Sequence, residues 1–481
     1  MRTIAALLIL LFVAGCASSG SKKRKEEAKE RRRRSVLLTT TDDERVGAEA
    51  ARSVQAEIGT LDDKGLNEYV QRIGRKVLRG LPRRDFAYRF SVVDQMEPNA
   101  FALPGGHIFI SRGLLALVNE ESELACVIGH EIVHAARRHS AQQQAVARAQ
   151  GALMLPRSRA ATLAAYGRDM EREADRLGQQ LCAAAGYDPM AMASFMRSLD
   201  QRERLLIGRA RRPTFIDTHP GTRERAAVNS ARASELRYTP DPALAGGKDR
   251  ERHLNEVEHM VLGDRPEAGV FVGELFLHPA LDFEIRFPKR WPTQNSARAV
   301  GATAPRRDAA IYLAGDLPPG DIVEVADKFA ADAKEDFGLD VTEKKRARIA
   351  GEEAVRYTFK GGPGGGVTAR VTFFPFAGTT WRMVGIAPSV AANRYLPPIL
   401  ISMNSFGKLS DENRRKIFSD RLEIVLARSG EDIIAVGDRS TNLLDPASTA
   451  LLNGLFGNEV FVGGELIKIV QRSPYASGPA R

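Results

Sequence analysis

The sequence predicts an α+β protein built from three parts. The first is a mainly helical unit with a small sheet, the second is an α+β domain with an antiparallel sheet, and the third is a small βααβ module. Two patterns carry this prediction. Apolar residues follow helical spacing in much of residues 43–235, whereas residues 269–412 hold short runs in which apolar and polar residues alternate. A chain of 481 residues is long enough for about three domains.

The N-terminus predicts export. Residues 1–15 have a positive start at Arg2 and an apolar run over residues 4–14, which is too short for a membrane-spanning helix of about 20 residues. The run ends in Val-Ala-Gly-Cys16, which resembles a bacterial lipobox. That resemblance implies cleavage before Cys16, acylation of this cysteine and, because no Asp follows it, sorting to the outer membrane. An ordinary signal peptide cut near Ala17 is the alternative, and both place the protein in the bacterial periplasm.

Residues 16–42 are predicted to form a basic tether. Nine basic and three acidic side chains between residues 22 and 34 contribute +6 of the formal net charge of +10. Beside a lipid anchor such a run favours anionic headgroups or the cell wall, and it is equally compatible with a plain solvated linker. The rest of the chain is close to neutral, so the charge argues against nucleic-acid binding.

Residues 43–235 are predicted to form one unit around a buried helix. Amphipathic helices are expected at Arg45–Ile58 and Leu61–Leu78, and strands at Tyr88–Val93 and His107–Ser111. The strand at His107–Ser111 has two interpretations that stay open. It is either an edge strand that pairs with an extended peptide or an ordinary strand of the core.

The most specific motif is His130-Glu131-Ile132-Val133-His134. Two histidines four positions apart lie on one face of a helix, so both imidazoles can reach one metal ion. Glu131 points about 100° round the helix, where it can contact a water held in the metal's open position. Zinc with three protein ligands and a water is the arrangement for hydrolysis. Apolar neighbours predict that this helix is buried, where imidazoles and a carboxylate are costly unless they bind something. The Ala/Gln-rich stretch 141–155 either continues this helix or forms a flap over the site.

A third ligand is expected from a charged helical segment further along the chain. Glu171 and Asp175 are four positions apart and share a face, so Glu171 can bind zinc while Asp175 accepts a hydrogen bond from a ligating imidazole. Glu173 is an alternative ligand on composition alone, and a solvated charged helix is the alternative to any metal role. His139 lies about 140° round the helix from His134 and is interpreted as structural.

Together these residues resemble the HtpX/BepA/CAAX-prenyl-protease family of zinc metallopeptidases. The matching motifs are His130-Glu131-x-x-His134, Glu171-x-x-x-Asp175, residues 99–115, and Thr218-His219-Pro220 followed by Arg225. The resemblance covers roughly residues 40–235 and implies a zincin-like fold, one zinc ion per chain and the cleavage of polypeptides. It also implies that Glu171, and not Glu173, is the third zinc ligand.

The same resemblance places two further residues near the metal. His219 would stabilise an oxyanion or act as a removable fourth ligand that keeps the enzyme latent, and a turn residue is the plain alternative. Arg225 would orient that segment or contact the transition state. Cys126 and Cys182 could pair in the oxidising periplasm, but buried free thiols are the favoured interpretation.

The remainder of the chain is interpreted as two accessory parts after a linker over residues 236–268. Residues 269–412 are expected to contain short strands and one amphipathic helix, Asp321–Phe337. Residues 420–472 resemble a LysM module, a βααβ fold that binds N-acetylglucosamine polymers. The usual Gly-Asp-Thr-Leu of that module is Gly-Glu-Asp-Ile over residues 430–433, which lacks the threonine hydroxyl. Peptidoglycan binding and a purely structural role therefore both stay open.

The sequence thus predicts a zinc endopeptidase of the bacterial envelope, anchored to the outer membrane through Cys16. Zinc is assigned to His130, His134 and Glu171, while Glu131 acts as general base and then as acid to the leaving amine. The family resemblance implies misfolded or stalled envelope proteins as substrates, which is a quality-control role. Two alternatives are an envelope scaffold that binds peptidoglycan with its peptidase unit latent, and a peptidoglycan amidase or endopeptidase.

Overall fold

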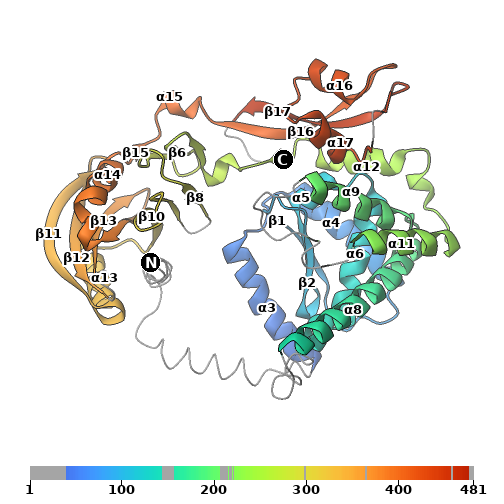
Figure 1. The fold of residues 1–481 in the computed structure, drawn as a ribbon, viewed down its shortest axis with the longest axis horizontal. Helices are drawn as coiled ribbons and strands as arrows, with labels where there is room; N and C mark the ends of the chain where they lie inside the picture. Colours follow the sequence, from blue (N-terminus) through green and yellow to red (C-terminus); the bar gives the residue numbers. More distant parts are fainter. Residues whose placement is uncertain are drawn as a thin grey trace. The chain divides into compact units, whose positions relative to one another are not determined.

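The computed structural model describes residues 39–143, 156–205, 215, 219, 222–296, 299–362, 366–456 and 459–475. The predicted signal peptide, Cys16, the tether up to residue 38 and residues 144–155 of the predicted flap lie outside the described residues. The chain divides into two compact units (Figure 1). Within the described part, one unit contains residues 39–263 together with 420–473, and the other contains residues 264–419 together with 474–475.

The first unit is mainly helical, as predicted. The helix α4 shows why: Leu66, Val70, Ile73 and Val77 recur at helical spacing and are all buried, and Asp63 caps its start by accepting from the Leu66 amide. The two helices predicted ahead of the metal motif correspond to α3 and α4. The helices of this unit before the C-terminal module are α3 (Thr40–Glu57), α4 (Lys64–Val77), α5 (Arg112–Leu117), α6 (Glu121–Ala136), α8 (Pro156–Ala184), α9 (Ala191–Leu205), α11 (Thr222–Glu235) and α12 (Lys248–Val257).

A three-stranded sheet accompanies these helices, with β1 (Arg89–Val93), β3 (His107–Ser111) and β2 (Ala100–Leu103) in the order β1-β3-β2. The strand β3 is parallel to β1 and antiparallel to β2. The interpretation of His107–Ser111 as an edge strand is therefore wrong, because β1 pairs with its second side. In this sheet β3 is the central strand, and β1 and β2 are the two outer strands.

The C-terminal module belongs to the same compact unit. It consists of β16 (Phe418–Leu426), α16 (Ile433–Arg439), α17 (Pro446–Leu452) and β17 (Leu466–Pro474), which is the predicted βααβ order, and β4 (Val261–Leu262) pairs with β16. Lys468 of β17 is fully buried, and its Nζ donates to the carbonyl oxygens of Ala116 at 2.7 Å and Val118 at 2.8 Å. Leu422 and Val470 join the same hydrophobic core as the helices around α6. The module therefore helps to hold the loop from which α6 starts.

The second unit is an α+β domain built on antiparallel strands, as predicted. Its larger sheet has the order β11-β12-β13-β14-β10-β9-β8 and the smaller one has the order β15-β7-β6-β5. The strands are β5 (Val270–Val272), β6 (Leu275–His278), β7 (Phe283–Arg286), β8 (Thr293–Asn295), β9 (Val300–Thr303), β10 (Ala310–Leu317), β11 (Leu339–Ile349), β12 (Glu352–Gly361), β13 (Val367–Phe376), β14 (Thr379–Pro388) and β15 (Gly407–Lys408).

The α-helices described in this unit are α13 (Ile322–Phe337), α14 (Ala392–Asn404) and the short α15 (Asp411–Arg414). The helix α13 is the predicted one, and Asp321 caps it by accepting from the amides of Val323 and Glu324. The sequence did not predict α14, because Pro397 and Pro398 lie inside it and proline normally breaks a helix.

None of the described helices combines the length and the apolar character that a membrane-spanning helix needs.

A buried histidine, His253 of α12, makes the stability of the first unit depend on pH. The side chain is fully buried, its Nδ1 accepts from the Tyr69 hydroxyl at 2.9 Å and its Nε2 donates to the Leu115 carbonyl at 3.0 Å. Burial lowers the pKa of His253 to about 3. The folded protein thus keeps this ring neutral at pH values where the unfolded chain, with a pKa of about 6.5, binds a proton.

The contribution of His253 to stability is complete above about pH 6.5 and is lost as the pH falls towards 3. Over this window we expect the unfolding free energy of the wild type to fall by about 1.4 kcal/mol per pH unit more than that of His253→Gln, which keeps a donor but does not titrate. Urea unfolding at several pH values measures the difference. Identical slopes in the two proteins would contradict the prediction.

Candidate metal centre

The helix α6 carries the predicted metal motif on a buried face. Its side chains Leu124, Val127 and Ile132 are fully buried, so the helix lies inside the unit and not on its surface. The same packing buries His130 completely, and its Nε2 lies 2.9 Å from Nε2 of His134. The four-residue spacing thus brings both imidazoles to one point, as predicted.

The helix α8 brings one glutamate to the two histidines. Glu171 Oε2 lies 3.4 Å from His130 Nε2, and Glu171 Oε1 lies 3.4 Å from His134 Nε2. Glu173 points elsewhere: its carboxylate lies 3.1 Å from Arg137 Nε and 3.5 Å from His139 Nε2. The geometry therefore favours Glu171 over Glu173 as the carboxylate ligand.

His219 completes the cluster from a separate part of the chain. Its Nδ1 lies 2.9 Å from Glu171 Oε2 and 3.3 Å from His130 Nε2. The ring stacks on Phe215 with a centroid separation of 4.1 Å, and the His219 amide donates to the Phe215 carbonyl. Phe215 was not singled out from the sequence, because a single aromatic residue four positions before a histidine is no distinct signal.

The four side chains fit a zinc ion. Among the described residues, His130, His134, Glu171 and His219 form a group whose potential ligand atoms all lie within 4.8 Å of one another. Four ligands placed about 2.1 Å from a tetrahedral ion are about 3.4 Å apart. The separations that involve His130 or Glu171 are between 2.9 and 3.4 Å, and imidazole nitrogen with carboxylate oxygen is a donor set that zinc prefers. This cluster is therefore suited to bind zinc.

The protonation of two of the donors, His134 and Glu171, agrees with that role. Burial lowers the pKa of His134 well below its ordinary value, so this ring is neutral at neutral pH. Burial opposes ionisation of Glu171, but the neighbouring His219 and His130 outweigh it and hold the pKa of the carboxyl well below its usual range. Neutral imidazole and ionised carboxylate are the forms that bind a metal ion.

Glu131 lies beside the four potential metal ligands, and one of its carboxylate oxygens accepts no hydrogen bond from the described residues. The residue is buried, and its Oε1 has no hydrogen-bond donor among the described residues, although His219 Nε2 lies 3.4 Å away. The backbone amide of Ala102 in β2 bonds to the same carboxyl group, and burial raises its pKa. A carboxyl group with a raised pKa beside a metal centre is suited to accept a proton and to release it again.

Asp175 and Arg225 contact the potential metal ligands. Asp175 Oδ1 lies 3.0 Å from His130 Nδ1, and Arg225 donates to both Asp175 oxygens at 2.6 and 2.7 Å. Arg225 Nη1 also lies 2.9 Å from Glu171 Oε2 and donates to the His219 carbonyl at 3.1 Å. Burial lowers the pKa of His130, but the contacts with the carboxylates of Asp175 and Glu171 outweigh burial and raise this pKa to about 9. The two residues therefore fix the directions of His130 and Glu171, and Arg225 also holds the backbone of His219.

His139 lies outside the group that could hold the metal. Its Nδ1 is 3.0 Å from Nδ1 of His134, on the side of that ring opposite to Nε2. It therefore orients His134, which agrees with the structural interpretation.

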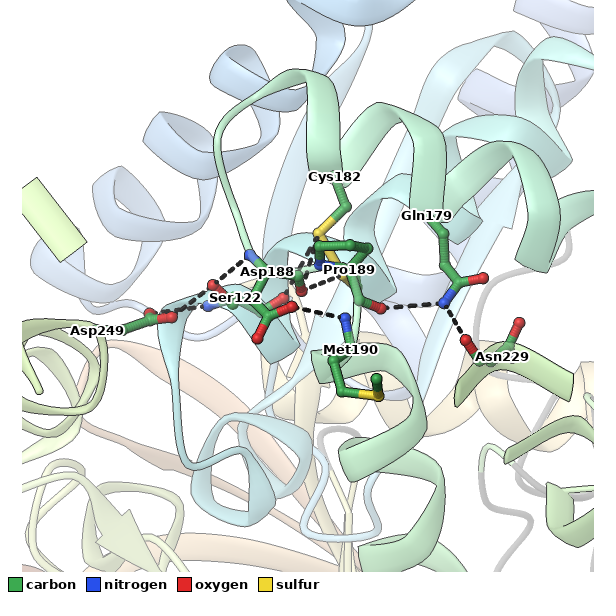
Figure 2. The surroundings of a disulfide bond; sticks show 9 residues. Ser122, Gln179, Cys182, Asp188, Pro189, Met190, Asn229 and Asp249 are labelled. Carbon is green, nitrogen blue, oxygen red and sulfur yellow. Dashed lines mark hydrogen bonds between the residues drawn. A yellow bond between two sulfur atoms is a disulfide. The ribbon is translucent and has the colours of Figure 1, made fainter. Parts of the chain in front are cut away.

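A disulfide joins the two helices that carry the cluster, and it corrects the interpretation of the cysteines as free thiols. Cys126 of α6 bonds to Cys182 of α8, and both side chains are fully buried (Figure 2). Next to the bond, the Ser122 hydroxyl donates to Asp249 and accepts from the Asp188 amide. Spacing could not decide this pairing, because 56 positions separate the cysteines and the contact depends on how two helices pack.

Two histidines and a glutamate that can bind zinc, with a further buried carboxyl group beside them, are the arrangement found in the active sites of metal-dependent hydrolases. Residues 64–233 match the sequence model of Peptidase family M48. The chain is 29% identical over 202 residues to the mitochondrial metalloendopeptidase OMA1 of Schizosaccharomyces pombe, which covers 38% of this chain and 58% of that protein. It is 28% identical over 217 residues to the beta-barrel assembly-enhancing protease of Escherichia coli, which covers 40% of this chain and 44% of that protein.

A third relative is the mitochondrial metalloendopeptidase OMA1 of Bos taurus, with 33% identity over 159 residues, 28% of this chain and 30% of that protein. The chain thus spans between 30% and 58% of the length of these three relatives. The comparisons support a metalloendopeptidase, in agreement with the family resemblance of the motifs.

Proposed function

We propose that this protein is a zinc-dependent endopeptidase of the bacterial cell envelope. The observation that carries the proposal is the convergence of His130, His134 and Glu171 beside the buried carboxyl group of Glu131. His130, His134 and Glu171 are the zinc ligands. When bound, zinc lowers the pKa of a water molecule and polarises the carbonyl group of the scissile peptide bond.

The protein's own groups then handle the protons. Glu131 accepts a proton from the water while the water oxygen bonds to the carbonyl carbon of the peptide. Glu131 then gives that proton to the leaving amine as the C–N bond breaks. Asp175 and Arg225 keep His130 and Glu171 in place during this step. His219 Nδ1 lies within the donor cluster, which supports the role of a removable fourth ligand more than that of an oxyanion donor.

The substrate backbone is proposed to pair with β2. This strand is at the edge of its sheet, and Ala102 within it contacts the general base. An extended peptide that adds to this edge would pass beside Glu131 through main-chain hydrogen bonds, which tolerate many side chains. The proposal moves the peptide-binding role from His107–Ser111 to Ala100–Leu103.

The location and the partners are proposed from the lipobox resemblance and from the names of the relatives. Membrane anchoring through Cys16 and a place at the periplasmic side of the outer membrane are proposed from the lipobox. We propose misfolded or stalled envelope proteins as substrates. The name of the E. coli relative, beta-barrel assembly-enhancing protease, supports this proposal. Binding of peptidoglycan by residues 420–472 is proposed from the LysM resemblance and the βααβ order. Fractionation of Cys16→Ser and pull-down on isolated peptidoglycan test these two points.

The decisive experiment is the zinc content and casein cleavage of purified protein that starts after Cys16. We expect about one zinc per chain and cleavage that a chelator removes and zinc restores. If zinc is bound without cleavage, cleavage by His219→Ala would identify a latent enzyme, and its absence would favour a scaffold. Folded protein that binds no zinc would refute the proposal.

A further inference from the structure

The helices α6 and α8 meet along a regular antiparallel seam. Residues further along α6 contact residues that come earlier in α8. The contacts along this seam are Cys126 with Cys182, Gly129 with Gly178, His130 with Asp175 and His134 with Glu171. Two of these contacts belong to the metal centre, and the other two continue the same line away from it.

The glycine contact holds the two backbones unusually close. A methyl group on Gly178 would lie 2.8 Å from the backbone nitrogen of His130 and 2.9 Å from its Cα. A methyl group on Gly129 would lie 2.8 Å from the carbonyl oxygen of Gly178. Neither contact involves a flexible side chain that could move aside, so a larger residue must displace α6 at the position of a zinc ligand.

The disulfide fixes the same seam one turn further from the metal. Cys126 precedes His130 by four residues and therefore lies on the same face of α6. Its partner Cys182 follows Asp175 by two helical turns on α8. The Cα atoms of the two cysteines are 5.1 Å apart, so the bond links the helix backbones through two short side chains.

We propose that the Cys126–Cys182 disulfide and the Gly129–Gly178 contact are positioning elements of the metal centre. They set the register of α6 on α8 and thereby the separation of His130 and His134 from Glu171. A slip of one residue along a helix moves a side chain by about 1.5 Å and turns it by about 100°, whereas zinc distances tolerate about 0.2 Å. The inference rests on the proposed zinc function and extends it to four residues that touch neither metal nor substrate.

The test compares Gly178→Ala and the double variant Cys126→Ala/Cys182→Ala with wild type. Gly167→Ala is the matched control, because Gly167 lies on the same helix and an added methyl group would meet only the end of the Gln143 side chain, at 3.8 Å. Zinc affinity is measured by competition with a chromogenic chelator, and the visible spectrum of the cobalt-substituted protein reports the coordination geometry. Circular dichroism establishes that each protein is folded.

We expect Gly178→Ala to weaken zinc binding by roughly 10- to 100-fold and to change the cobalt spectrum, as the loss of a residue that orients a ligand does. The double cysteine variant should shift both readouts in the same direction, and it needs no extra space, so it serves as the test if Gly178→Ala fails to fold. Gly167→Ala should match wild type. Wild-type affinity and spectrum in the folded variants would overturn this inference alone, whereas folded wild type without zinc would overturn the proposed function as well.

Discussion

Replacement of Glu131 by glutamine is expected to lower kcat for peptide hydrolysis by about 10²- to 10⁴-fold while the zinc content stays at wild-type level. The carboxyl group is buried beside the donor cluster, and its Oε1 has no hydrogen-bond donor among the described residues. Glutamine has nearly the same shape and keeps an acceptor for the Ala102 amide, but it cannot take a proton from water. The ligands His130 and His134 are unchanged, so the metal should remain.

The measurement is kcat and KM on a fluorogenic peptide, together with zinc content. A matched control is Glu121→Gln, which changes another buried glutamate of α6, whose partners are the Tyr187 hydroxyl and Arg252 and not the metal cluster. Glu121→Gln should retain most of the activity. If Glu131→Gln cleaves as fast as wild type, Glu131 is not the base, and if it loses its zinc, the carboxyl group has a role in metal binding instead.

The part of the site that lies on one helix could be predicted from the sequence. The positions of His130, Glu131 and His134 relative to one another follow from helix geometry alone, and the structure agrees with them. The contribution of the second helix could not be derived in this way. Glu171 and Glu173 are on the same helix, and only the register of α8 against α6 decides which of them faces the histidines.

The errors have the same origin. His107–Ser111 has the composition of a strand, but its central place depends on a parallel pairing with β1 that alternation within one strand does not reveal. The pairing of Cys126 with Cys182 also depends on the packing of α6 on α8. Local patterns thus predicted α3, α4, α13, several strands and the βααβ order, whereas α14 and the contacts between distant segments required the structure.

The strongest test of the register of α8 is the pair Glu171→Gln and Glu173→Gln. Glu171→Gln removes a charged donor that lies 3.4 Å from both His130 Nε2 and His134 Nε2, so we expect zinc affinity to fall by more than the roughly 100-fold loss typical of an outer contact. Activity at limiting zinc should disappear with it. The change also removes a partner of Arg225, which adds to the loss.

Glu173→Gln is the matched control for this prediction, because it is the same chemical change two positions along the same helix. Its carboxylate contacts Arg137 and His139, and it is partly exposed, so its loss should leave zinc affinity within a few-fold of wild type. Isothermal titration with zinc and activity against zinc concentration measure both variants. If Glu173→Gln loses the metal and Glu171→Gln retains it, α8 is rotated in solution relative to the arrangement described above. If both retain it, the third ligand must come from elsewhere, and His219 is then the first residue to replace, since its Nδ1 already lies 3.3 Å from His130 Nε2.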